Sequence, residues 1–142
     1  MVVRLEFTST FEMLDLVQIV CDHVARSAGL DEDGQHDISV AIRESVINAI
    51  KHGNRGDPGK LVFVDFSIDP AAGDNGARAL TIRVRDQGEG FDPAAVADPL
   101  APENLLKPSG RGIFLIRNFM DDLQWGSAPQ GGMEIQMVKR VL

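Results

Sequence analysis

A chain of 142 residues, 44% of them hydrophobic and 25% charged, is long enough to bury one core, and we expect a single domain spanning residues 1–142. Its 14 Lys and Arg against 21 Asp and Glu give a formal charge of -7, which repels a phosphate backbone and argues against direct nucleic-acid binding. Cys21 is the only cysteine, which excludes an internal disulfide and a cysteine metal cluster. The first ten residues do not resemble a signal peptide and no apolar run is long enough to cross a bilayer, so we expect a soluble cytoplasmic protein without a membrane partner.

The first third of the chain has the pattern of one strand followed by two helices. Apolar and polar residues alternate over residues 3–7, as in a half-buried strand. Ser9 and Glu12 have the spacing of a capping box, which predicts the start of the first helix. Asp31 is placed to cap a second helix, and apolar residues at helical spacing continue it to about His52.

The middle of the chain indicates two paired strands followed by an irregular segment. Residues 61–68 are mostly β-branched or aromatic, and residues 80–85 alternate between apolar and polar types. Residues 69–76, rich in Gly, Asp, Asn and Pro, predict a loop between these strands that is longer than a tight turn. Residues 92–109 carry four of the seven prolines and show no sustained periodicity, which is typical of a functional lid or a disordered loop.

The last third indicates a third helix and a closing hairpin. Helical spacing begins at residues 110–112 and continues to Met120, and residues 123–137 alternate on both sides of a turn. Strands joined by hairpins, with helices partly segregated from them, favour an α+β fold. We predict a two-layer sandwich in which a mostly antiparallel sheet carries its helices on one face.

Three motifs need an explanation beyond the core pattern, and the first lies in the second helix. Glu44 and Asn48 are four residues apart, so they project from the same side of the helix, and Lys51 extends this stripe before Gly53 ends it. Asn48 can supply an oxygen ligand to Mg²⁺, and Glu44 can accept a proton from an attacking hydroxyl group. The alternative is an ordinary solvated face of a helix.

The second motif, residues 86–90, stands where an apolar strand ends. Gly88 and Gly90 allow close approach of another molecule to the backbone. An ionised Asp86 only accepts hydrogen bonds, so it favours the amino group of adenine over the carbonyl oxygen of guanine. The alternative is a plain turn, because Asp and Gly are common turn residues.

The third motif is Ser109, Gly110, Arg111 and Gly112 at the start of the third helix. Free backbone N–H groups and the positive end of the helix dipole favour an anion there, and glycine lets a phosphate approach closely. Arg111 can add a charge-assisted contact. A flexible loop with an exposed arginine is an equally good reading of these residues in isolation.

The order of the three motifs along the chain is more specific than any of them alone. Residues 44–53 resemble the N box of the GHKL superfamily, which includes gyrase, histidine kinases and mismatch-repair ATPases. Residues 86–90 resemble its first glycine box, and residues 110–112, with the nine residues that follow, resemble its second. The resemblance covers nearly the whole chain and implies the Bergerat ATP-binding fold. Compact size, a short lid and the Asn-Phe-Met-Asp run after the second glycine box resemble the anti-sigma serine kinases of partner-switching systems.

The resemblance implies a role for each matching residue. It makes Glu44 the catalytic base, Asn48 the ligand of Mg²⁺ and Asp86 the residue that binds adenine. It also implies contacts to ATP from the remaining matched positions, which are Lys51, His52, Gly88, Gly90, Phe91, Ser109, Gly110, Arg111 and Gly112.

The resemblance further implies an anti-sigma factor that binds a sigma factor and phosphorylates a serine of an anti-anti-sigma protein with a STAS domain. A homodimer is also implied. The alternative from another class is an ATP-dependent module that retains a partner with little or no phosphotransfer, although Glu44 argues against it. A detached histidine-kinase catalytic domain is disfavoured, because no helix pair carries a phospho-accepting histidine.

Overall fold

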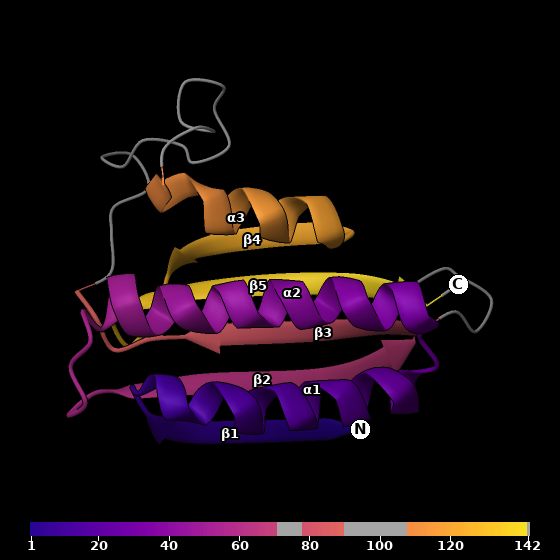
Figure 1. The fold of residues 1–142 in the computed structure, drawn as a ribbon, viewed down its shortest axis with the longest axis horizontal. Helices are drawn as coiled ribbons and strands as arrows, with labels where there is room; N and C mark the ends of the chain where they lie inside the picture. The colour runs from indigo at the N-terminus through magenta and orange to yellow at the C-terminus, as the bar shows by residue number, and fades with distance from the viewer. Residues whose placement is uncertain (71–77, 90–107, 142) are drawn as a thin grey trace.

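The protein consists of one antiparallel sheet with helices on one of its faces, seen in a computed structural model that describes residues 1–70, 78–89 and 108–141 (Figure 1). Residue 70 and residues 108–112 are described by their backbone alone. The sheet has the order β1-β2-β3-β5-β4, and every pairing in it is antiparallel. Its strands are β1 (Val2–Thr8), β2 (Leu61–Pro70), β3 (Arg78–Arg85), β4 (Asp122–Ser127) and β5 (Met133–Val141). The helices are α1 (Leu14–Ala28), α2 (Glu32–Asn48) and α3 (Pro108–Phe119), with a 3-10 turn η1 (Phe11–Met13) before α1 and a π-helical turn η2 (Ala49–Gly53) after α2. The predicted α+β sandwich is therefore confirmed.

The two faces of the sheet follow from the alternation of its strands. Val64 and Val84 face each other across β2 and β3 and are buried under the helices, as are their neighbours at every second position. The other face is polar, and there the Arg85 guanidinium lies 4.3 Å from the centre of the Phe63 ring. An antiparallel sheet with one packed and one polar face needs helices on one side only, which is the observed arrangement.

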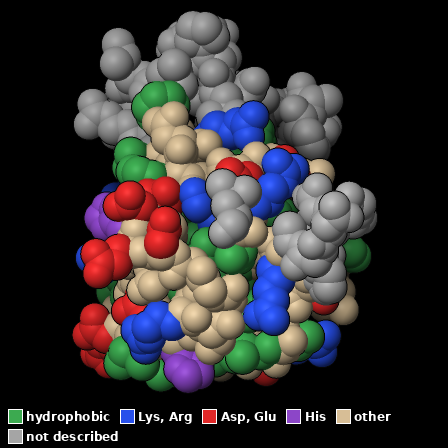
Figure 2. All heavy atoms as spheres, turned by 90° about the vertical axis from the view of Figure 1, so that its right-hand side faces the viewer, with side chains coloured by type: hydrophobic (Ala, Val, Ile, Leu, Met, Phe, Trp, Pro, Cys, Tyr) green, Lys and Arg blue, Asp and Glu red, His purple; other side chains and the backbone are tan. Residues whose placement is uncertain are grey.

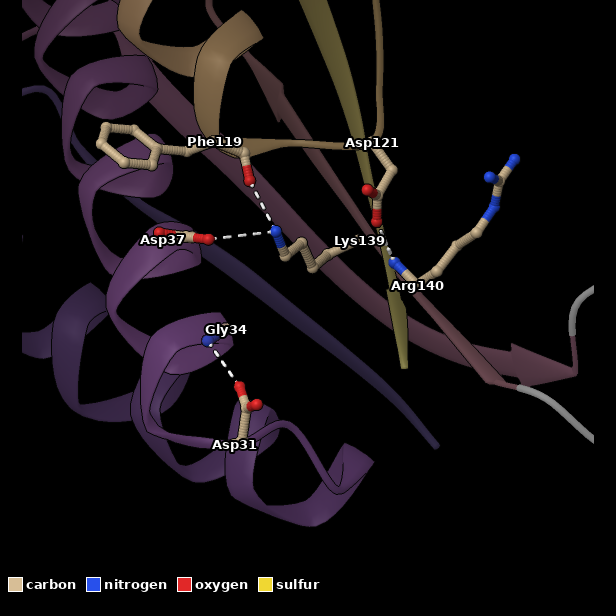
Figure 3. Close-up of polar contacts among 7 residues, drawn as sticks. All are labelled: Asp31, Gly34, Asp37, Phe119, Asp121, Lys139 and Arg140. Carbon is tan, nitrogen blue, oxygen red and sulfur yellow. Dashed lines mark hydrogen bonds and ion pairs between the residues drawn. The ribbon is translucent and has the colours of Figure 1, made fainter. Parts of the chain in front are cut away.

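The starts of the first two helices show one wrong prediction and one correct one. The capping box is absent: the Ser9 hydroxyl is buried and finds no hydrogen-bond partner among the described residues, and the 3-10 turn η1 precedes α1. The pattern failed because Thr10, one residue later, is the N-cap of that turn, which begins at Phe11 and leaves Ser9 outside the capping position. Asp31 does cap α2, since its Oδ1 accepts a hydrogen bond of 2.8 Å from the Gly34 N–H (Figure 3).

The far end of α3 is tied to both α2 and β5 through Lys139 (Figure 3). The Lys139 ammonium group, on β5, donates to the backbone carbonyl of Phe119 at 2.9 Å and lies 3.1 Å from the Asp37 carboxylate. The Phe119 ring also meets the His36 ring edge to face, with 6.3 Å between centroids. These contacts place the last turn of α3 beside the first turns of α2, so the two helices run antiparallel.

Acidic side chains gather on one side of the end of the molecule at which α2 begins, and Lys and Arg side chains lie on the rest of this face (Figure 2). Asp31, Glu32 and Asp33 are exposed there, where negative charge is favourable beside the positive end of the helix dipole. Among the described residues, no helix has both the length and the apolar composition that a bilayer crossing requires.

Candidate functional site

The described residues of all three motifs lie at the same end of the sheet, opposite the end at which α2 begins (Figure 1). The turn η2, the C-terminal end of β3, the beginning of β5 and the N-terminal end of α3 meet there. Because α3 is antiparallel to α2, its first turn lies alongside the end of α2 that carries Glu44 and Asn48. Phe119 on α3 and Asp37 on α2 lie close together, because both bind Lys139. Gly112 precedes Phe119 by seven residues and Glu44 follows Asp37 by seven, so each lies about 10 Å further along the helix pair in the same direction.

Asp86 is the most buried acidic residue of this end, at 3% exposed. Its Oδ1 accepts hydrogen bonds from the Gly88 N–H at 2.8 Å and from the Met133 N–H at 3.1 Å. The Asp86 N–H donates to the Met133 carbonyl, as in a regular antiparallel ladder. In such a ladder the Met133 N–H would donate to the Asp86 carbonyl, but here it donates to the Asp86 carboxylate instead. Among the described residues, Oδ2 accepts no hydrogen bond, which leaves this carboxylate oxygen able to accept one from a ligand.

Three glycines surround Asp86 so closely that no side chain fits at their positions. A Cβ on Gly53 would collide with the Asp86 carboxylate, and one on Gly132 would collide with the Asp86 carbonyl. A Cβ on Gly88 would collide with the carbonyl of Gly53. Gly132 also has a φ of 82°, which disfavours other residues. The result is a cradle in which the backbone of three glycines packs directly against Asp86.

Glu44 and Asn48 lie on α2 with half-buried side chains, one helical turn apart. The π-helical turn begins at the next residue, where the Asn54 N–H donates to the carbonyl of Ala49 instead of that of Ile50. The predicted helical path to His52 is therefore correct, but its last turn is wider than an α-helix. Such turns are rare and are often found at functional sites.

Of the remaining predicted residues, some are described with their side chains, some by their backbone alone, and two lie outside the described residues. Lys51 and His52 are exposed on η2. Gly88 belongs to the cradle around Asp86, whereas Gly90 and Phe91 lie outside the described residues, as does most of the expected lid. Ser109, Gly110 and Arg111 fall within the first turn of α3, which begins two residues earlier than expected, and Gly112 begins its second turn. Their backbone is described, and it forms the helix N-terminus that the third motif predicted.

Sequence reasoning missed four residues that shape this site. Gly53, which the sequence predicts only as the end of a helix, and Gly132, which lies between the strands of the predicted closing hairpin, both pack against Asp86. Met133 lies outside the three motifs, in the predicted closing hairpin, yet its N–H donates to the Asp86 carboxylate. Asn54 belongs to none of the three motifs, yet it is completely buried and its Oδ1 accepts a hydrogen bond from the N–H of Gln87, the residue after Asp86. The pair of glycines directly before an alternating strand was the one signal available in the sequence.

The chemistry of the site fits a purine base and a phosphate chain. The Oδ2 of Asp86, which accepts no hydrogen bond from the described residues, is the kind of acceptor that the exocyclic amino group of adenine needs. Glu44 and Asn48 provide oxygen atoms of the kind that Mg²⁺ binds, at the same end as the N-terminus of α3.

Comparison with known proteins identifies the class to which this arrangement belongs. Residues 7–139 match the family described as histidine kinase-like ATPase domain, and the chain belongs to this family. A nucleotide is therefore the ligand expected in the site.

Curated relatives make the comparison more specific. The chain is similar to the serine-protein kinase RsbW of Staphylococcus epidermidis, with 27% identity over 146 residues, covering 98% of this chain and 86% of the relative. It is 35% identical over 113 residues to an anti-sigma F factor of Halalkalibacterium halodurans, covering 77% of this chain and 71% of the relative. It is also 24% identical over 128 residues to the serine-protein kinase RsbW of Listeria innocua, covering 86% of this chain and 77% of the relative.

Proposed function

We propose that this chain is an anti-sigma factor and serine kinase that binds ATP with Mg²⁺. The observation that carries the proposal is Asp86, a buried carboxylate with one oxygen held by two N–H groups and the other free in a glycine cradle. The names of the relatives, serine-protein kinase and anti-sigma F factor, support the same function. The proposal treats residues 1–142 as one kinase domain, which is supported by a single core cluster extending from Phe7 to Met137.

The proposed site divides ATP among three parts of the fold. Asp86 accepts a hydrogen bond from the adenine amino group. The free N–H groups of residues 109–111, in the first turn of α3, bind the phosphates with a contact from Arg111, and Gly112 allows the phosphates to approach closely. Asn48 supplies an oxygen ligand to Mg²⁺, which, when bound, neutralises charge on the phosphates.

The proposed reaction is a direct transfer of the γ-phosphoryl group to a serine of an anti-anti-sigma protein. The serine oxygen forms a bond to the γ-phosphorus as the bond from that phosphorus to the bridging oxygen breaks, and ADP leaves with the bonding electrons. Glu44 accepts the proton of the serine hydroxyl group. The phosphoserine then places about two negative charges in the interface with a kinase whose own formal charge is -7, which weakens the complex.

Partner exchange is the proposed output of this reaction. Release of the phosphorylated STAS-domain protein frees the kinase to bind and sequester a sigma factor. We also propose that the chain acts as a homodimer in the cytoplasm. Sedimentation of the purified chain at several concentrations tests the dimer.

The decisive experiment is affinity capture from extract of the native cell with ATP and Mg²⁺, followed by mass spectrometry of the captured proteins. We expect a phosphoserine on one captured protein and a sigma factor in the same eluate. Retention of a partner that stays unphosphorylated would instead favour an ATP-dependent binding module.

Two substitutions separate binding from transfer in the purified protein. Asp86→Asn should weaken ATP binding at least about tenfold, because its amide nitrogen cannot accept a hydrogen bond. Glu44→Ala should leave ATP affinity unchanged and abolish transfer. Equal losses of binding in the two variants would contradict the separate roles.

A further inference from the structure

Asn54 stands between two strands at the point where their pairing ends. In the register of β2 and β3, Phe63 faces Arg85, so Leu61 faces Gln87 two residues further on. A continued ladder would join the backbones of Leu61 and Gln87 directly. Instead, the Asn54 amide lies between them: its Nδ2 donates to the Leu61 carbonyl at 3.0 Å and its Oδ1 accepts from the Gln87 N–H at 2.8 Å.

The side chain of Gln87 completes this separation. Its Oε1 accepts a hydrogen bond of 2.8 Å from the Leu61 N–H, so both backbone groups of Leu61 are bound by side chains. Three hydrogen bonds thus join the end of η2, the start of β2 and the segment after β3. The strands part where Asn54 enters, and residues 86–89 leave the sheet there.

The bond to Gln87 acts directly on Asp86, because the Gln87 N–H and the Asp86 carbonyl belong to one peptide group. Asn54 holds the N–H side of that group, and the backbone at Gly132 packs against the carbonyl side. With both sides held, the Asp86 side chain leaves the backbone in a fixed direction. Asn54 is completely buried, so water cannot replace it without rearrangement of these segments.

We propose that Asn54 is a positioning residue that sets the direction of the Asp86 carboxylate and thereby the preference for adenine. The inference rests on the proposed nucleotide site and extends it by one residue. Asn54 also follows η2 directly, so its side chain links the segment that carries Glu44 and Asn48 to the segment that binds the base.

The test compares two nucleotides in calorimetric titrations of the full chain with Mg²⁺. ATP carries the amino group that Asp86 binds, whereas inosine triphosphate carries a carbonyl oxygen at the same place on the ring. The unsubstituted protein should prefer ATP. Asn54→Ala should weaken ATP binding roughly tenfold and reduce the preference for ATP over inosine triphosphate, because the carboxylate is no longer held in one direction.

The preference for ATP over inosine triphosphate distinguishes a role in positioning the Asp86 carboxylate from a general effect on stability. Ser39→Ala is the matched control, since it removes a hydrogen bond of 2.7 Å to Gln18 between α1 and α2, remote from the site. It should lower the melting temperature without changing the preference. An equal change of preference in Ser39→Ala, or an unchanged affinity and preference in a folded Asn54→Ala, would overturn the inference.

A second variant and the titration of the unsubstituted protein cover the cases in which Asn54→Ala fails to fold or no nucleotide binds. If Asn54→Ala does not fold, Asn54→Ser decides by the same criterion, because its hydroxyl is too short to join Leu61 and Gln87. If the unsubstituted protein binds neither nucleotide, the proposed function itself fails at the first titration. The positioning role alone fails when the unsubstituted protein prefers ATP and the substituted ones keep that preference.

Discussion

The α-carbon of Gly53 lies against the carboxylate of Asp86, in space that a side chain at position 53 would need. The two residues belong to different motifs, one at the end of the helix that carries Glu44 and the other after β3. Their contact explains why the turn η2 must end in glycine: a larger residue would push away the group proposed to bind the base.

Gly53→Ala should weaken ATP binding by about tenfold or more, since the added methyl group displaces the carboxylate that accepts the adenine amino group. The φ of Gly53 lies outside the left-handed region, so the effect comes from the collision and not from the backbone. Gly126→Ala is the control, because its Cβ would meet nothing within 4 Å and should leave affinity unchanged. Calorimetric titration with ATP measures both variants, and equal affinities would contradict the cradle.

Asn48→Ala should make ATP binding insensitive to Mg²⁺, because the variant lacks the side-chain oxygen proposed to hold the ion. The measurement is the affinity for ATP with Mg²⁺ and with a chelator. Gln124→Ala removes an exposed amide on β4 and should keep the dependence of the unsubstituted protein. A Mg²⁺ dependence that survives in Asn48→Ala would exclude this residue as the ligand.

Lys139→Met should lower the free energy of unfolding by about 1–3 kcal/mol. The substitution leaves the Phe119 carbonyl and the Asp37 carboxylate without the donor that now joins them, while it keeps most of the buried length of the side chain. Urea denaturation gives the change. Arg4→Ala breaks the exposed, 4.0 Å pair with Asp65 and should cost no more than about 0.5 kcal/mol, so similar losses in the two variants would show that the Lys139 contacts are not special.

Cys21 should react with a thiol reagent only when the protein unfolds. Burial, together with the neighbouring charge of Asp22, raises the pKa of the Cys21 thiol to about 12, so the reactive thiolate is scarce at pH 8. Because the folded pKa is the higher one, this thiol stabilises the fold below the ordinary cysteine pKa and loses that contribution as the pH rises toward 12. Labelling at pH 8 with and without urea tests the expectation, and rapid labelling of the native protein would refute it.

The fold was predictable because its strands alternate without interruption. The buried face of each strand is evident from its apolar residues, which are Val62, Val64 and Phe66 in β2 and Leu80, Ile82 and Val84 in β3. Because all of them must face the core, the pairing register of the two strands is fixed. The capping box was not predictable in this way, because Ser9 and Glu12 have the correct spacing but the chain first forms a 3-10 turn. Local spacing does not say which of two adjacent polar residues starts a helix.

The site was predictable in its motifs and not in its contacts. Asp86 stood out because it is an acid between an apolar strand and two glycines. Its partner Met133 is 47 residues away, and Asn54 reaches Gln87 across 33 residues. Backbone N–H groups carry no signature in the sequence, so a hydrogen bond from Met133 can be found only once β3 and β5 are paired.

The dependence of Asp86 on Met133 has a consequence for how the protein is made. A growing chain that has emerged only as far as β4 already contains Glu44, Asn48, Asp86 and the N-terminus of α3. It still lacks β5, whose Met133 N–H holds the Asp86 carboxylate, so we expect nascent or truncated chains without β5 not to bind nucleotide. Competence for ATP then arises only after β5 has been synthesised, and a polypeptide that still lacks this strand cannot compete with the folded domain for the nucleotide.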